Sequence, residues 1–121
     1  MGARPDLLAW LGVAAGGAVG SLARAGLQGV LVRPWGTLAA NVGGCLAMGL
    51  LLGMDLGPRA RAFLAVGVLG GFTTLSGLGM DAWLAWQAGE RGTLAAYLAA
   101  SLVGSALALV AGLSLARACL S

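Results

Sequence analysis

Charged and titratable side chains are scarce in this 121-residue chain, which contains no lysine and no histidine. Charged residues make up 9% of the sequence, and seven arginines with four acidic residues cannot form the charged shell that a soluble domain needs. Hydrophobic residues make up 60% of the chain, and its mean hydropathy is +0.94. The composition therefore excludes an ordinary soluble domain and indicates a membrane protein whose solvent is mostly lipid.

The same shortages exclude several kinds of chemistry. Without histidine, and with Cys45 and Cys119 isolated on different segments, the chain has neither metal-ligand spacing nor a catalytic dyad, so we expect no enzymatic activity. The formal net charge of +3 comes from single arginines spread over the loops, and they form no patch that would imply a nucleic acid partner.

Three polar interruptions divide the chain into four apolar segments, each reaching or approaching the roughly 20 residues that a membrane-spanning helix needs. The interruptions centre on Pro34, Pro58 and Glu90. The predicted spans are 7–32, 37–54, 62–86 and 94–116, which together make an all-α membrane protein with one domain over 1–121. Four crossings put both termini on the same side of the membrane.

The arginines give only a small bias in orientation under the positive-inside rule. Four lie on the terminal side and two or three on the other side: Arg4, Arg59, Arg61 and Arg117, against Arg33 and Arg91, with Arg24 added if it snorkels outward. Such a chain can insert both ways, which makes an antiparallel dimer possible. A fixed topology with a small bias is the alternative.

The third segment is the most unusual, because glycine and hydroxyl side chains are concentrated in its middle. The run is Gly70-Gly71-Phe72-Thr73-Thr74-Leu75-Ser76-Gly77-Leu78-Gly79. Glycine at this density is unfavourable in a continuous helix, and irregular backbone is tolerated at membrane depth only where it is buried in protein or lines a cavity. We therefore predict that the third span is broken here and faces a polar pathway.

Glycine elsewhere recurs with four-residue spacing, which lets helix backbones approach closely inside a membrane. We predict that most of these glycines are packing residues. The repeats are Gly12, Gly16 and Gly20; Gly49 and Gly53; Gly67 and Gly71; and Gly104, Ala108 and Gly112.

Uncharged polar side chains mark one face of the second span and one face of the fourth. Thr37 and Asn41 are four residues apart, and Tyr97, Ser101 and Ser105 repeat with the same spacing. Hydroxyl and amide groups can donate hydrogen bonds to a small anion without a charge that would trap it. They can equally bond to one another between helices, and the spacing alone does not choose.

Two charged residues fall inside or near the predicted spans. Arg24 is about 17 residues into the first segment, or on the order of 26 Å along a helix, which places it near the far interface. It either snorkels to the headgroups or raises the anion concentration at a pore mouth. Asp81 either lies near an interface or pairs with an arginine.

Four sequence pieces, in order on the four spans, resemble the Fluc (CrcB-type) fluoride channel family over nearly the whole chain. The pieces are Gly16-Gly17-x-x-Gly20-x-x-x-Arg24, Gly36-Thr37-x-x-x-Asn41-x-x-Gly44, Gly70-Gly71-Phe72-Thr73-Thr74-x-Ser76, and the repeat of Tyr97, Ser101 and Ser105. The resemblance implies a dual-topology, antiparallel homodimer in the cell inner membrane. It also implies two narrow pathways for the passive export of fluoride, which gives fluoride resistance.

The resemblance further implies roles for individual residues. The backbone carbonyls of Gly70 and Thr73 would hold a structural sodium ion at the dimer centre, and Arg24 would sit toward a vestibule. Asn41 would hydrogen-bond the fluoride ion. The pathway residues implied in this way are Thr37, Asn41, Phe72, Thr74, Leu75, Ser76, Leu78, Tyr97, Ser101 and Ser105.

The chain departs from the family where two phenylalanines are typical, because it has Leu75 and Leu78 there. Leucine lacks the positive ring edge that favours an anion. The subunit therefore conducts by hydroxyls and amide alone, conducts weakly, or needs a homologous partner subunit that supplies the rings. A non-conducting accessory subunit is a further alternative. A small multidrug exporter fits less well, since it needs a carboxylate in the middle of the first span, which has only Asp6 at its very start.

Overall fold

The computed structural model describes residues 6–120, which are almost entirely helical. The helices are α1 (Leu7–Val30), α2 (Trp35–Leu52), α3 (Pro58–Arg61), the π-helix η1 (Ala62–Leu69), α4 (Gly70–Phe72), α5 (Leu75–Gln87) and α6 (Arg91–Leu120). The segments from α3 to α5 follow one another along a single crossing. Within the described residues, the chain thus has four helical stretches long and apolar enough to cross a membrane.

Each predicted span corresponds to one of these four helical stretches, with helix ends displaced by a few residues. The last helix differs most, since it covers Arg91–Leu120 instead of 94–116. Arginine forms helix as readily as most apolar residues do, so the helix continues beyond the lipid-soluble run. Hydropathy locates the part of a helix that is apolar enough to lie in lipid, but it does not locate the residues at which the helix begins and ends. Arg4, one of the arginines counted on the terminal side, lies outside the described residues.

The start of α1 is set by Asp6, which caps the helix. Its Oδ1 atom accepts a hydrogen bond from the backbone N–H of Ala9 at 2.6 Å, and its Oδ2 atom lies 3.0 Å from Nε of Arg59. The Ala9 N–H, followed by the Arg59 guanidinium, lowers the pKa of Asp6 below its usual value. The cap and the ion pair connect the beginning of the first crossing to the beginning of the third.

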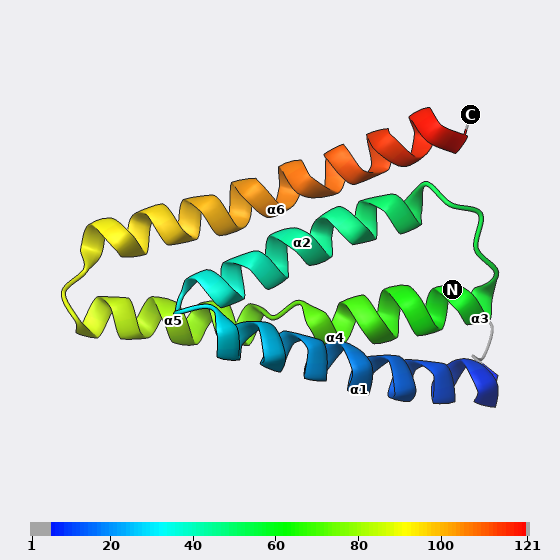
Figure 1. Cartoon of the computed structure of the whole chain (residues 1–121), viewed down its shortest axis with the longest axis horizontal. Helices are drawn as coiled ribbons and strands as arrows, with labels where there is room; N and C mark the ends of the chain where they lie inside the picture. The colour runs from blue at the N-terminus through cyan, green and yellow to red at the C-terminus, as the bar shows by residue number, and fades with distance from the viewer. Residues whose placement is uncertain (1–5, 121) are drawn as a thin grey trace.

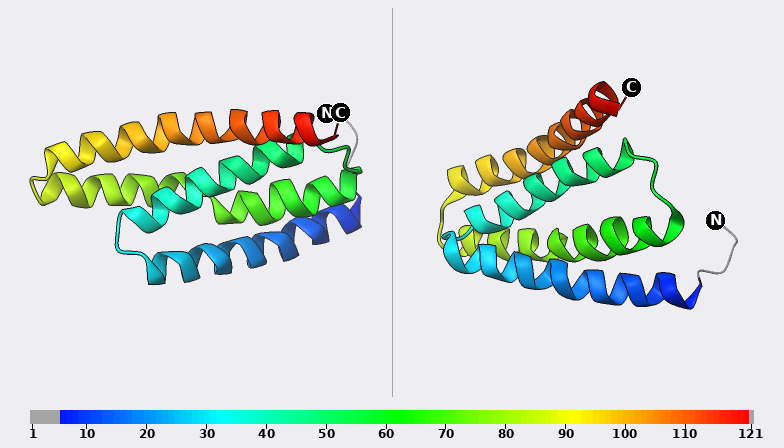
Figure 2. Two further views of the ribbon diagram at one scale, coloured as in Figure 1. Left: turned by 45° about the horizontal axis from the view of Figure 1, so that its top comes forward. Right: turned by 45° about the vertical axis from the view of Figure 1, so that its right-hand side comes forward.

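The four crossings run up and down, so that α1 begins and α6 ends at the same end of the bundle (Figure 1). They pack as two pairs: α1 lies along η1 and α4, and α2 lies along α6, as both views in Figure 2 also show. Large apolar side chains such as Leu22 and Leu107 remain exposed on the outside, at 73% and 64%. This is the arrangement expected when lipid is the solvent.

Glycine permits the close approach within each pair. A Cβ atom added at Gly20 would overlap the carbonyl oxygen of Val68, and one added at Gly71 would lie 2.6 Å from the carbonyl oxygen of Gly17. In the other pair, added Cβ atoms at Gly49 and Gly112 would overlap backbone oxygens of the facing helix. The packing role predicted from the four-residue spacing is confirmed at these positions.

The third crossing is interrupted, as predicted, but not at a glycine. Thr73 (φ −83°, ψ 154°) and Thr74 (φ −151°, ψ 117°) are extended, whereas Gly77 and Gly79 lie inside α5. Glycine density indicated the right region because close packing and irregular backbone both occur there. The break itself is located by the hydrogen-bond partners that threonine and Asn41 provide, as described below.

The glycine contacts can be tested by a pair of matched substitutions on α1. Gly20→Ala should destabilise the protein by about 1–3 kcal/mol, because the new methyl group overlaps backbone that cannot move aside. Gly26→Ala should leave stability unchanged or slightly higher, since nothing lies within 4 Å of its added Cβ. Thermal unfolding of the detergent-solubilised variants measures both, and equal effects would contradict this account of the packing.

Candidate functional site

The break in the third crossing is held by the side chain of Asn41 on α2. The backbone N–H of Thr74 donates to Oδ1 of Asn41 at 2.7 Å, and Nδ2 of Asn41 donates to the carbonyl oxygen of Thr74 at 3.0 Å. The amide thus pairs with both polar groups of one residue, as a neighbouring strand would. In lipid, unpaired backbone groups cost several kcal/mol each, so this pairing permits the extended segment.

Hydroxyl groups complete the hydrogen bonding on both sides of the break. Oγ1 of Thr73 donates to the carbonyl oxygen of Leu69 at 3.0 Å, and Oγ1 of Thr74 accepts from the N–H of Gly77 at 2.9 Å. The hydroxyls of Thr74 and Ser76 are 3.1 Å apart. Thr74 is therefore an N-cap for α5 in the ordinary sense.

These bonds free two carbonyl oxygens at the break, those of Gly70 and Thr73. In a continuous helix, the N–H of Thr74 would bond to Gly70 and the N–H of Gly77 would bond to Thr73. Both donors are directed elsewhere, to Asn41 and to the Thr74 hydroxyl. The carbonyl of Gly71 instead accepts from Nε of Arg24 at 3.2 Å. The break presents backbone oxygens that the helix itself no longer satisfies.

A cavity of about 260 Å³ lies next to the break, between α2, α5 and α6. We call it the inner cavity. Its lining is partly hydroxyl and amide and otherwise apolar: Asn41, Cys45, Thr73, Thr74, Leu75, Leu78, Ser101, Leu102 and Ser105. Ser101 is 4% exposed, and its hydroxyl is the buried side-chain polar atom left without a hydrogen-bond partner in the described part of the chain. An unpartnered buried hydroxyl calls for an explanation, and a water molecule or an ion in the adjoining cavity is one.

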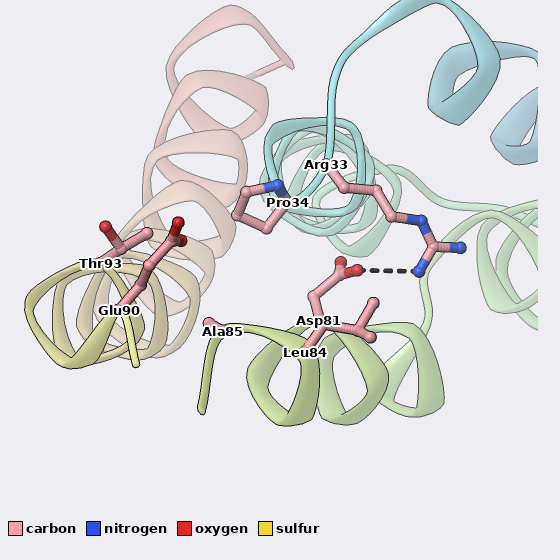
Figure 3. A pocket seen from close by; sticks show the side chains of 7 residues that line it. All are labelled: Arg33, Pro34, Asp81, Leu84, Ala85, Glu90 and Thr93. Atoms are coloured by element: carbon pink, nitrogen blue, oxygen red, sulfur yellow. Dashed lines mark hydrogen bonds and ion pairs between the residues drawn. The ribbon is translucent and has the colours of Figure 1, made fainter. Parts of the chain in front are cut away.

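A second cavity, of about 140 Å³, lies at the end of the bundle opposite the termini (Figure 3). We call it the mouth cavity. It is lined by Arg33, Pro34, Asp81, Leu84, Ala85, Glu90 and Thr93. Nη1 of Arg33 lies 3.0 Å from Oδ1 of Asp81, and the hydroxyl of Tyr97 donates to Oδ2 of Asp81 at 3.2 Å.

Two fully buried side chains separate the cavities. Thr37 follows Pro34 of the mouth cavity by about one turn on α2 and precedes Asn41 of the inner cavity by another. Tyr97 lies between Thr93 and Ser101 on α6 in the same way. Thr37 and Tyr97 are each 1% exposed, and Oγ1 of Thr37 accepts from Nε2 of Gln28 at 3.0 Å. The polar residues thus form one line from the mouth to the break.

The structure brings together most of the residues singled out from the sequence. Six lie on this line: Thr37, Asn41, Thr74, Tyr97, Ser101 and Ser105. Leu75 and Leu78 line the inner cavity, and Ser76 lies beside it through its bond to Thr74. Phe72 lies outside the residues that line either cavity, and its ring packs near Gly44.

Sequence reasoning did not predict that Arg33 is the residue that contacts Asp81. It left Asp81 open between an interface and an arginine partner, and it treated Arg33 as an ordinary loop residue. The two are 48 residues apart, and no periodicity connects a loop arginine to a particular acidic residue on another helix. For Arg24, the sequence allowed two positions, at the lipid headgroups or at a pore mouth. In the structure, its Nε donates to the Gly71 carbonyl oxygen.

Comparison with known proteins gives a consistent result. The family model described as "CrcB-like protein, Camphor Resistance (CrcB)" matches residues 11–113. The chain is 43% identical over 116 residues to the "Fluoride-specific ion channel FluC" of Paracoccus denitrificans (strain Pd 1222), covering 89% of this chain and 94% of that protein. It is 46% identical over 119 residues to the protein of the same name from Rhodospirillum centenum (strain ATCC 51521 / SW), covering 88% and 94%.

The inner cavity can be tested through the thiol that lines it. In a Cys119→Ser background, Cys45 should react readily with a water-soluble maleimide, because the reactive thiolate forms only where water reaches. The control is Leu107→Cys in a Cys45→Ser, Cys119→Ser background, since Leu107 is 64% exposed in the isolated chain but faces lipid. If the control reacts faster than Cys45 in proteoliposomes, the cavity is dry.

Proposed function

The chain belongs to the CrcB-like family, whose relatives named above are fluoride-specific ion channels, and we propose that it exports fluoride passively across the cell inner membrane as an antiparallel homodimer. The observation that carries the pathway is the Ser101 hydroxyl, buried beside the inner cavity without a partner. It stands in line with the other hydroxyls and the Asn41 amide. Channel conduction needs binding strong enough to admit an ion and weak enough to release it.

The inner cavity suits a small, strongly hydrated anion that must lose its water. Ser101 has a free hydroxyl, and the amide of Asn41 keeps a second N–H after its bond to Thr74. No arginine lines this cavity among the described residues, so an anion would be solvated without being trapped by a charge. Asn41 thereby hydrogen-bonds the break and can also hydrogen-bond an anion. The two alternatives that its spacing left open, bonding between helices and bonding to an anion, are therefore compatible.

The freed carbonyls of Gly70 and Thr73 fit the structural sodium ion that the family resemblance implies. Neutral backbone oxygens are the ligands that hard cations accept. One chain supplies two of these oxygens, so a second copy would be needed to complete a coordination shell. When bound, the cation would hold the two broken helices together by charge, and the nearly balanced arginines of the two ends permit the copies to insert in opposite directions.

A second candidate function is that of a partner subunit in a heteromeric channel. It is favoured by Leu75 and Leu78, which line the inner cavity where the family resemblance places aromatic rings. Leu75 is 79% exposed in the isolated chain, so a neighbouring subunit can meet it directly. A homologous partner could then supply the ring edges that this chain lacks.

Fluoride efflux from liposomes, followed with an ion-selective electrode, tests the pathway. The wild type should release fluoride well above empty vesicles. Ser101→Ala should lower the rate about ten- to hundredfold, since a hydrogen bond to a charged group is worth about 1.5–3 kcal/mol. Ser114→Ala, an exposed serine on the same helix, is the control and should conduct normally. No wild-type flux would exclude the homomeric channel and leave the partner-subunit function.

The two leucines can be tested by restoring rings. Leu75→Phe combined with Leu78→Phe should raise the flux severalfold, because two positive ring edges then face the dehydrated anion. Leu102→Phe adds a ring on the opposite wall of the same cavity and controls for the change in volume. A double variant that conducts no better than the wild type would show that the leucines are not what limits conduction.

A further inference from the structure

We propose that Arg33 is the counter-ion of Asp81. By neutralising this carboxylate, Arg33 makes the mouth cavity accessible to fluoride or another small inorganic anion. This inference rests on the proposed function, since it concerns the end of the same line of polar residues. It assigns a specificity role to a residue that lies in the loop between α1 and α2.

The argument begins with the burial of Asp81. Its side chain is 1% exposed, in contact with Tyr97 on α6 and Arg33 in the loop. On the proposed pathway, an anion that leaves Tyr97 for the mouth cavity comes close to this carboxylate, because the Tyr97 hydroxyl is bonded to its Oδ2 atom and Asp81 lines that cavity. Where water is scarce, the repulsion between two negative charges is severalfold larger than in bulk water. An unpaired carboxylate at this point would therefore block the anion.

The charges around the mouth cavity make Arg33 decisive. Among the seven residues that line it, Arg33 is the one cation and Asp81 and Glu90 are the two anions. Glu90 is exposed, so water and salt screen its charge. Arg91, its neighbour in sequence, is held with its guanidinium carbon 4.6 Å from the centre of the Trp86 ring. Removing Arg33 leaves a cavity whose lining charges are negative.

The position of Arg33 lets it act on an entering anion as well as on Asp81. Its side chain is 51% exposed, and only Nη1 contacts the carboxylate. The other terminal nitrogen points away from Asp81, as Figure 3 shows. A guanidinium carries five N–H donors, so most remain free for water or an anion at the entrance. Because Asp81 is buried, removing Arg33 would leave a buried carboxylate without its counter-ion.

Fluoride efflux from liposomes tests the inference by neutralising each member of the ion pair in turn. Arg33→Gln should lower fluoride efflux at least about tenfold, because it leaves the buried carboxylate unpaired. The double variant Arg33→Gln, Asp81→Asn should conduct as fast as the single variant Asp81→Asn. Asparagine still accepts the hydrogen bond from Tyr97 but carries no charge that Arg33 would need to neutralise. Arg33→Lys should retain most of the flux. Arg91→Gln removes an arginine from the same end without touching Asp81, and so controls for altered membrane insertion.

A second measurement is independent of conduction. With both native cysteines replaced by serine, Thr93→Cys places a thiol in the mouth cavity, where anionic and cationic methanethiosulfonate reagents report the local potential. Arg33→Gln should lower the ratio of anionic to cationic reaction rates about tenfold, and Asp81→Asn should reverse the fall.

The outcomes separate this inference from the proposed function. A wild type without flux overturns the homomeric channel, and the reagent ratio still decides the role of Arg33. A conducting wild type whose Arg33→Gln variant keeps its flux and its reagent ratio overturns the inference. It is also overturned if Arg33→Gln loses flux and Asp81→Asn fails to restore it, because Arg33 would then act on something other than the carboxylate.

Discussion

The structure depends on one exchange of hydrogen bonds, between the amide of Asn41 and the backbone of Thr74. Lipid offers no partners to a residue that leaves helical geometry, so an interruption at mid-span must be satisfied from within the protein. Asn41 supplies a donor and an acceptor to the same residue, at 3.0 and 2.7 Å. That pairing frees the Gly70 carbonyl and permits the extended segment that borders the inner cavity.

Close packing is what keeps the break away from lipid. Glycines allow α1 to lie against η1 and α4, and others allow α2 to lie against α6, at separations where any side chain would collide. The two pairs meet less closely than the helices within each pair, and the inner cavity lies on the side where α5 approaches α6. Small residues therefore close the gap within each pair and leave space beside the break, where the inner cavity lies.

The polar side chains between the mouth cavity and the break differ in how completely they are hydrogen-bonded. Asp81 has a partner on each oxygen, and Thr37 accepts from Gln28, but the Ser101 hydroxyl has no partner among the described residues. An arginine and a carboxylate offset one another at the mouth cavity, whereas the residues that line the inner cavity are uncharged. Under the proposed function, neutral donors in the inner cavity would bind an anion without retaining it.

Composition and spacing were enough to identify lipid as the solvent, four crossings, glycine-mediated packing and the polar set from Thr37 to Ser105, because burial in lipid and helical periodicity act locally along the chain. They also indicated an interruption near Gly70. Only the tertiary structure located it at Thr73 and Thr74, since that position depends on an amide 33 residues away. The pairing of Arg33 with Asp81 was also determined only by the tertiary structure. A contact between residues 48 positions apart depends on how the helices pack and cannot be predicted from the local sequence pattern.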